Sequence, residues 1–509
     1  MYNHSTRSDF LISTKETVKS DRSKSANIMR PRIFNCRLIT SLTLSTKVPK
    51  RTAIDELSKH FASSPKSSAS VQNVGDSNYA AAIFASRDFA TWLEDVSFVS
   101  GMLESLFKRK TGLRENSNPI DVLCAVTDGL TPKRLFSEPR TGLSILYGSA
   151  NSILPGLWSA DDSGSNTSQD RESSVSFLSN PLPRDTRPLE ITLPLANTIF
   201  QNGRRSTLFA SRWQLDHDGS IMRTMIHEKQ SQTLGLRATS GNHIKPFLPL
   251  LPLTPPRKIV AGLGNIVRQV EVNGTATPAS KELEAIIPKV FDTRSERDTS
   301  YSPGPIGVWC WVIPPEVVEK RNLFDLKVFE SGSSQFEAEL SLEVMNVFSE
   351  LLSSGCRLHK ILSGGGGWGL KQGLLSLDPE TTHSLPDQDD VEMFIRAFQE
   401  RNNPNPSEGL VTPGSYLMFC IEPHWTKNEI GLSQSISPTT AIGVVQNSEQ
   451  EPDSAGLSNE VDIIDDHFGV VSKSGLFLKA TNLPHVSQAT GQSQPFTTKV
   501  DLPRAAFIL

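Results

Sequence analysis

The sequence predicts an α+β fold, in which mostly antiparallel mixed sheets are packed by a few helices and joined by long polar loops. Short apolar runs bounded by turn residues outnumber stretches with helical spacing. Charged residues make up only 21% of the 509 residues, while serine, proline, asparagine and glutamine are plentiful. No internal repeat of fixed period is present, and the length suits two or three domains.

Residues 1–78 are expected to form a disordered leader. From Met29 the chain reads MRPRIFNCRLITSLTLSTKVPKR, with no acid before Asp55. A segment rich in arginine, serine and threonine and free of acids is typical of a mitochondrial presequence. Because acids precede Met29, we expect translation to begin there rather than at Met1, and we expect a location in the mitochondrial matrix. The alternative is a disordered basic tail on a cytosolic or nuclear protein.

Residues 79–245 are expected to form an N-terminal α+β part. Apolar residues recur at helical spacing over Ala80–Lys110 and predict a helix, and Val122–Val126 and Leu143–Tyr147 read as buried strands. The segments 191–200 and 206–215 predict an extended pair around a turn at 201–204. A loop is expected from about Asp218 to His243.

Residues 256–509 are expected to form a C-terminal α+β part. Strands at 258–261 and 269–272 lead to a hairpin turn at Asn273-Gly274, and Thr277 is expected to cap a helix that starts at Pro278. Ser334–Ser354 has the clearest apolar stripe, and Ser334 with Glu337 predicts a capping box. Further strands are expected at 307–313, 357–362, 416–421 and 441–445, with a hairpin over 468–480.

A glycine-rich segment directly after the strand 357–362 is the strongest local signal. Such a loop can present bare backbone N–H groups to an anion, while an adjacent lysine neutralises the charge and an aromatic ring covers an apolar face. The alternative is a structural turn packed under another strand. Leu370 stands where a phosphate-binding loop has its lysine. The expected ligand-binding residues here are Gly364, Gly365, Gly366, Gly367, Trp368 and Lys371.

A second candidate lies at the turn after residues 191–200. Asn197, Asn202 and Arg204 place two amides and a guanidinium around this turn, and these groups can recognise a carboxylate or an amide. Turn chemistry alone also explains Asn202-Gly203.

No complete catalytic or metal-binding signature is present. The ten histidines include no H-E-x-x-H pair, no G-x-S-x-G marks a nucleophilic serine, and Gly262-Leu263-Gly264-Asn265 lacks the third glycine of a dinucleotide site. His217 and His467, each beside aspartates, are expected to be solvated loop residues. The five cysteines are an odd number, far apart, and are expected to be free, mostly buried thiols in a reducing compartment. No cofactor is indicated.

The net charge of −4 argues against a nucleic-acid partner, so DNA is not expected. No apolar run approaches the length of a membrane span, so no integral membrane segment is expected either. A small molecule is the expected partner, and protein partners stay open.

The blocks at 121–158, 194–213, GLGNIVRQ and LSGGGGWGLKQGLLSLDPE resemble fungal mitochondrial proteins of uncertain role, and the first block is similar to a FIST domain. The resemblance covers residues 120–480. It implies a sensory module that binds small ligands such as amino acids, and it supplies no catalytic residues.

We therefore expect a non-catalytic, small-ligand-binding or sensory protein. One alternative is an enzyme of unknown reaction near the 364–378 segment, with His359, Lys371 and Asp378 as candidates. Another is a mitochondrial assembly or scaffold factor.

Overall fold

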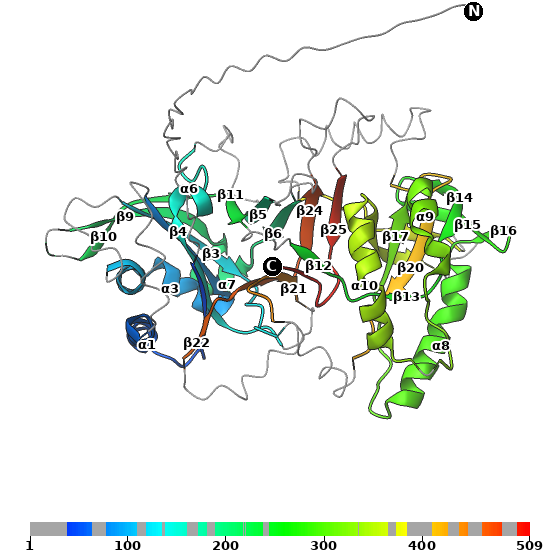
Figure 1. The fold of residues 1–509 in the computed structure, drawn as a ribbon, viewed down its shortest axis with the longest axis horizontal. Helices are drawn as coiled ribbons and strands as arrows, with labels where there is room; N and C mark the ends of the chain where they lie inside the picture. The colour runs from blue at the N-terminus through cyan, green and yellow to red at the C-terminus, as the bar shows by residue number, and fades with distance from the viewer. Residues whose placement is uncertain are drawn as a thin grey trace, which may run out of the picture. The chain divides into compact units, whose positions relative to one another are not determined.

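The computed structural model describes residues 38–63, 78–108, 119–134, 138–159, 172–180, 189–216, 218, 220–237, 244–333, 335–364, 373–383, 410–425, 437–445, 461–480 and 496–509. All described strands and helices belong to one compact unit, Asn35–Leu509 (Figure 1). The described strands form five sheets with a few helices, which confirms the α+β class. Their pairing is antiparallel except in β2–β3, β5–β11 and β21–β23.

A seven-stranded sheet dominates the N-terminal part. Its inner strands are buried on both faces, so they are rich in apolar residues instead of alternating with polar ones. The strand order is β10 (Ile221–Glu228), β9 (Leu208–Leu215), β3 (Ile120–Thr127), β2 (Tyr79–Ser86), β4 (Gly142–Ser149), β1 (Leu38–Thr43) and β22 (Asp462–Asp465).

Helices cover one face of this sheet, and further strands cover the other. Ile83 of β2 shares a core with Leu57 of α1 and Phe98 of α4. On the opposite face Phe84 contacts Phe177 of β5 and Phe468 of β23, with ring centroids 5.9 and 5.4 Å away. The helices are α1 (Lys50–Ser63), α3 (Ala90–Glu94) and α4 (Val96–Leu103), with short turns α6 (Ala150–Ile153) and α7 (Ile199–Asn202).

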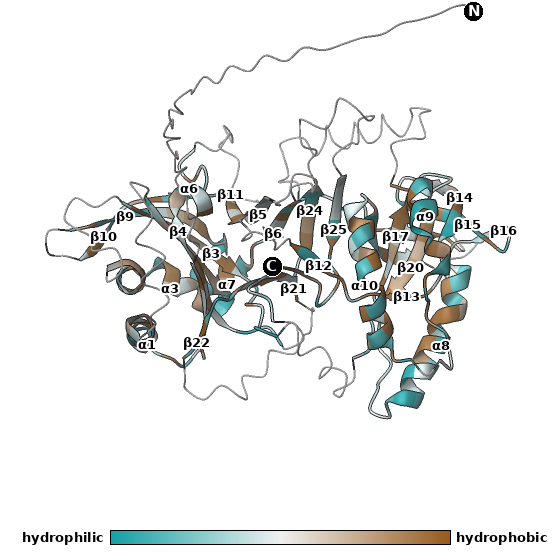
Figure 2. Cartoon of the chain, in the orientation of Figure 1, coloured by the Kyte–Doolittle hydropathy of each residue, from teal (hydrophilic) through white to brown (hydrophobic). Residues whose placement is uncertain are grey.

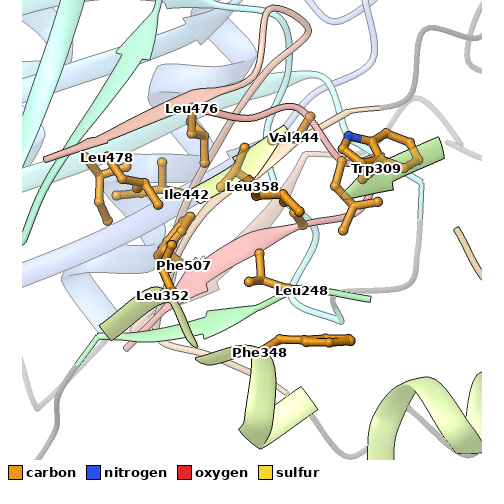
Figure 3. Packing of buried hydrophobic residues seen from close by; sticks show 14 of the residues in the cluster. Leu248, Trp309, Phe348, Leu352, Leu358, Ile442, Val444, Leu476, Leu478 and Phe507 are labelled. Carbon is orange, nitrogen blue, oxygen red and sulfur yellow. The ribbon is translucent and has the colours of Figure 1, made fainter. Parts of the chain in front are cut away.

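Two smaller sheets follow, with strands drawn from distant parts of the chain. Leu358 of β18, Ile442 of β21 and Leu478 of β24 lie in one apolar cluster (Figure 3). The five-stranded sheet has the order β11 (Ser231–Arg237), β5 (Ser174–Asn180), β6 (Leu189–Pro194), β24 (Leu476–Ala480) and β25 (Phe496–Val500). The four-stranded sheet has the order β12 (Lys245–Phe247), β26 (Ala506–Ile508), β21 (Thr440–Val444) and β23 (Phe468–Ser472).

The last large sheet is antiparallel throughout. Because β17 pairs with both β18 and β20, its pairing path returns on itself and forms a ring of six strands. The order is β13 (Leu251–Pro252), β20 (Tyr416–Ile421), β14 (Arg257–Leu263), β15 (Ile266–Val272), β19 (Leu375–Leu377), β18 (Arg357–Gly364) and β17 (Val308–Ile313), and β16 (Thr275–Pro278) pairs with β15.

Three helices accompany this sheet: α8 (Lys281–Arg297), α9 (Pro315–Arg321) and α10 (Glu337–Ser353). Phe348 of α10 stacks on Trp311 of β17 at 5.8 Å, and α10 carries both hydrophilic and hydrophobic residues (Figure 2). None of the described helices is both long and apolar enough to cross a bilayer.

The expected disordered leader is wrong for residues 38–63. Strand β1 lies between β4 and β22, and Leu42 is buried, because its apolar residues complete the sheet. The expected boundary near residues 245–256 does not separate two compact units either. Strand β22 pairs with β1, and β24 pairs with β6, so late residues complete the N-terminal sheets.

Five local expectations also need correction. The helix expected from Ala80 is wrong at its start, because residues 79–86 form strand β2. The spacing suggested a helix because alanine has no strand signature and this strand is buried on both faces of the sheet. The expected loop 218–243 contains β10 and β11, and helix α8 begins at Lys281, not Pro278. The segments 191–200 and 206–215 do not pair with each other, because they contribute β6 and β9 to different sheets. The hairpin expected over 468–480 is also wrong, because β23 and β24 belong to different sheets. The turn at Asn273-Gly274 is confirmed, with positive φ at both residues.

Candidate ligand-binding site

The described anchor of the glycine-rich segment is Gly364, the last residue of β18. A Cβ atom there would lie 2.2 Å from Leu375 Cδ2 on the neighbouring strand, so any other residue at this point would require the Leu375 side chain to move. Gly365, Gly366, Gly367, Trp368 and Lys371 lie outside the described residues. The ligand cradle that we expected there stays a prediction.

His359 and Asp378 lie together at the base of this segment, but not as an acid and base. His359 Nδ1 lies 2.9 Å from the backbone oxygen of Asp378, and burial lowers the pKa of the imidazole. The Asp378 carboxylate lies 3.2 Å from Lys499 Nζ, which also binds Glu380. Because Lys499 holds the carboxylate and a carbonyl holds the ring, this group stabilises the fold.

The turn between β7 (Asn197–Thr198) and β8 (Arg204–Ser206) uses its donors internally. Asn202 Nδ2 donates to Glu94 Oε1 at 3.1 Å and to Thr207 Oγ1 at 2.9 Å. Arg204 Nε donates to Glu94 Oε1 at 3.0 Å, and its Nη1 also binds Glu228. Asn197 Oδ1 accepts from the backbone of Ile199. These three predicted site residues therefore brace the turn.

His467 is buried, which corrects the expectation of a solvated loop residue. Its Nδ1 lies 3.1 Å from Ser41 Oγ of β1, which lies 2.9 Å from Ser144 Oγ of β4. Burial, and secondarily the charge of Lys133, lower the pKa of the ring to about 4. His217 lies outside the described residues.

The described cysteines are buried free thiols, as expected. Burial raises the pKa of Cys124 and of Cys356 to about 12, and it also raises the pKa of Cys310 and Cys420. A thiol in such surroundings is a poor nucleophile. Cys36 lies outside the described part of the chain.

A cavity of about 270 Å³ lies beside the start of α10. We call it the α10 cavity. Leu251, Val328, Phe329 and Leu340 contribute an apolar lining, and Lys327, Glu330 and Glu337 contribute charged groups. Apolar residues and polar or charged residues contribute about equally to the lining, so the cavity offers both kinds of contact to a small molecule.

A buried ion pair forms part of this wall. Arg294 of α8 donates from Nε to Glu337 Oε1 at 3.0 Å and from Nη2 to Oε2 at 2.7 Å. The backbone N–H of His424 also donates to Glu337 at 2.8 Å, and Arg294 Nη2 reaches the Glu422 carbonyl. Burial opposes the charge of Arg294, but the bonds to Glu337 outweigh it and raise its pKa. The wall is therefore rigid.

The other two charges differ in their partners. Lys327 Nζ lies 2.6 Å from Glu343 Oε1, and Gln335 also donates to Glu343. The Glu330 carboxylate has no partner among the described residues. The charge that the cavity offers to a ligand is therefore negative.

Sequence analysis missed this site because it assigned Glu337 another role. In the structure Phe336 precedes the first helical residue, Glu337, and provides no side-chain cap. Ser334, the other half of the expected capping box, lies outside the described residues. Glu337 instead points to Arg294, a partner 43 positions away.

Comparison with known proteins adds no assignment: no family model, no curated protein and no solved structure matches the chain. Within the described residues, no three histidine, cysteine, aspartate or glutamate side chains are grouped as metal ligands.

Proposed function

We propose that the protein binds a small, largely apolar molecule that carries one cationic amine, and that it does so in the α10 cavity without catalysing a reaction. The observation that carries the proposal is a cavity of mixed lining, whose apolar residues adjoin charged groups that are already paired except at Glu330. An ammonium group placed at Glu330 would form a charge-assisted hydrogen bond. The apolar part of the ligand would contact Leu251 and Leu340.

The size of the cavity limits the ligand. Pockets for drug-sized molecules measure roughly 300–1,000 Å³. At about 270 Å³ the α10 cavity suits a molecule of amino-acid size better than a nucleotide. This class agrees with the small ligands that the FIST-like resemblance implies.

Thermal-shift measurements on the full chain test the proposal. The probes are amino acids, their amides, and simple alkylamines and arylalkylamines. A ligand present at 100 times its dissociation constant adds about 2.7 kcal/mol to the free energy of unfolding. We expect at least one amine to raise the melting temperature, whereas the matching carboxylic acids do not.

Glu330→Gln is the informative variant, and Glu339→Gln is its matched control. Both remove an exposed acid, but only Glu330 lines the cavity. Loss of a hydrogen bond to a charged group corresponds to about tenfold weaker binding. We expect Glu330→Gln to bind about tenfold more weakly and Glu339→Gln to behave as wild type. If no amine binds, or if both variants bind as wild type, the proposal fails.

We also propose the mitochondrial matrix as the compartment, supported by the composition of the segment that begins at Met29. Strand β1 limits any presequence, because its removal would leave a gap between β4 and β22. A processing site must therefore precede Leu38. N-terminal sequencing of the mature protein tests this, and a mature chain that starts after Arg51 would contradict it.

A further inference from the structure

Strand β10 is the edge of the seven-stranded sheet and pairs only with β9 among the described strands (Figure 1). It exposes three large apolar side chains, with exposed fractions of 52% for Met222, 43% for Met225 and 50% for Ile226. An edge strand offers unpaired backbone N–H and C=O groups, which proteins usually protect with lysine, proline or a bulge. The segment IMRTMIHE contains neither lysine nor proline, and its protection is a bulge between Arg223 and Met225.

The pattern of charges on β10 suits a second copy of the same strand. Arg223, Ile226 and Glu228 lie opposite Trp213, Ser211 and Phe209, which are alternate residues of β9 and so share one face of the sheet. A bulge between Arg223 and Met225 inserts one extra residue. Arg223 and Glu228 therefore flank Ile226 at equivalent pairing positions on the same face.

We propose that two copies of the protein associate by antiparallel pairing of their β10 strands, about a two-fold axis at Ile226. Ile226 then faces its own equivalent, Met225 faces His227 of the partner, and Arg223 faces Glu228 of the partner on both sides of the axis. The pairing buries the apolar side chains and provides hydrogen-bond partners for the backbone groups of the strand edge. It also adds two ion pairs, each between Arg223 of one copy and Glu228 of the other.

The surroundings of Glu228 fit this arrangement. Arg204 already binds Glu228 and holds its exposed carboxylate at the strand edge, where the carboxylate can also accept from Arg223 of the partner. Ser100 of α4 donates to the backbone oxygen of Ile221 at 2.6 Å and fixes the start of β10 against the helices. The strand is therefore presented in a defined conformation, which lowers the entropy cost of association.

Sedimentation velocity of the full chain over a concentration series tests the association, and Ile226→Lys tests the surface. We expect a dimer for the wild type and a monomer for Ile226→Lys. Because Ile226 is half exposed in the single chain, the variant should melt at the same temperature as the wild type at concentrations where the wild type is monomeric. A monomeric wild type, or an Ile226→Lys variant that dimerises as well as the wild type, overturns the proposal.

Disulfide trapping tests the register. Residues directly opposite each other in an antiparallel pair have Cα atoms roughly 4.5–5.5 Å apart, within the range that a disulfide spans. We expect Ile226→Cys to form a covalent dimer under mild oxidation. Met222→Cys, equally exposed on the same strand but away from the axis, should not do so. Trapping of Met222→Cys but not Ile226→Cys rules out the proposed two-fold axis.

Discussion

Two charged networks in this protein use similar groups in opposite surroundings. The pair Arg294–Glu337 has side chains that are 7% and 6% exposed, and its Glu337 lines the α10 cavity. The network around Arg204, which is 42% exposed, joins Glu94 and Glu228 on the surface. Sequence analysis selected the second network for ligand binding, yet the first borders a cavity. Burial, rather than residue type, distinguishes a group that shapes a site from one that braces a turn.

Breaking the buried pair should have the largest effect. Arg294→Met leaves the Glu337 carboxylate buried without its partner, and we expect a loss of about 3–5 kcal/mol in the free energy of unfolding. Urea unfolding measures this loss. The double variant Arg294→Met, Glu337→Leu removes both charges and should recover part of it, because an apolar pair of similar volume avoids the desolvation penalty. A single variant as stable as wild type would contradict the buried pair.

Burial also predicts a strong pH dependence through His467. Its pKa is about 4 in the folded protein, against an ordinary value of 6.5 in the unfolded chain. Between pH 6.5 and 4 the unfolded chain binds a proton that the folded protein does not, so stability falls as the pH falls. The full loss is about 3 kcal/mol.

Urea unfolding at several pH values measures this contribution. We expect His467→Gln to flatten the pH dependence between pH 6.5 and 4. Equal slopes in the wild type and the variant would show that His467 is not buried in its neutral form.

Breaking the exposed network should have the smallest effect. Arg204→Met removes the bonds to Glu94 and Glu228, but solvent screens these charges, so we expect a loss of no more than about 1 kcal/mol. The same urea series measures it beside Arg294→Met. A loss as large as that of Arg294→Met would remove the distinction between the two networks.

The sequence predicts several of the buried strands, such as β3, β17 and β20, because apolar runs between turn residues indicate burial. It fails at β2, where the run YAAAIFAS is buried on both faces and alanine has no strand signature. It also fails at β1, because a basic flank hides the short apolar strand LITSLT. In both cases the partners that stabilise the strand are distant in the chain.

The candidate site was harder to predict than the fold. The glycines after β18 are visible in the sequence, and Gly364 does pack closely against Leu375. The α10 cavity instead depends on Arg294 of α8 meeting Glu337 of α10, and on Leu251 of β13 closing the wall. A local sequence pattern cannot predict that α8, α10 and β13, which are separate in the chain, come together in the fold.

Hydrogen–deuterium exchange with and without the best amine tests the central claim most directly. We predict slower exchange on ligand addition in residues 327–340, the range that holds most of the cavity lining, and unchanged exchange in residues 197–204, which form the braced turn. Protection at 197–204 with none at 327–340 would contradict the assignment of the ligand to the α10 cavity.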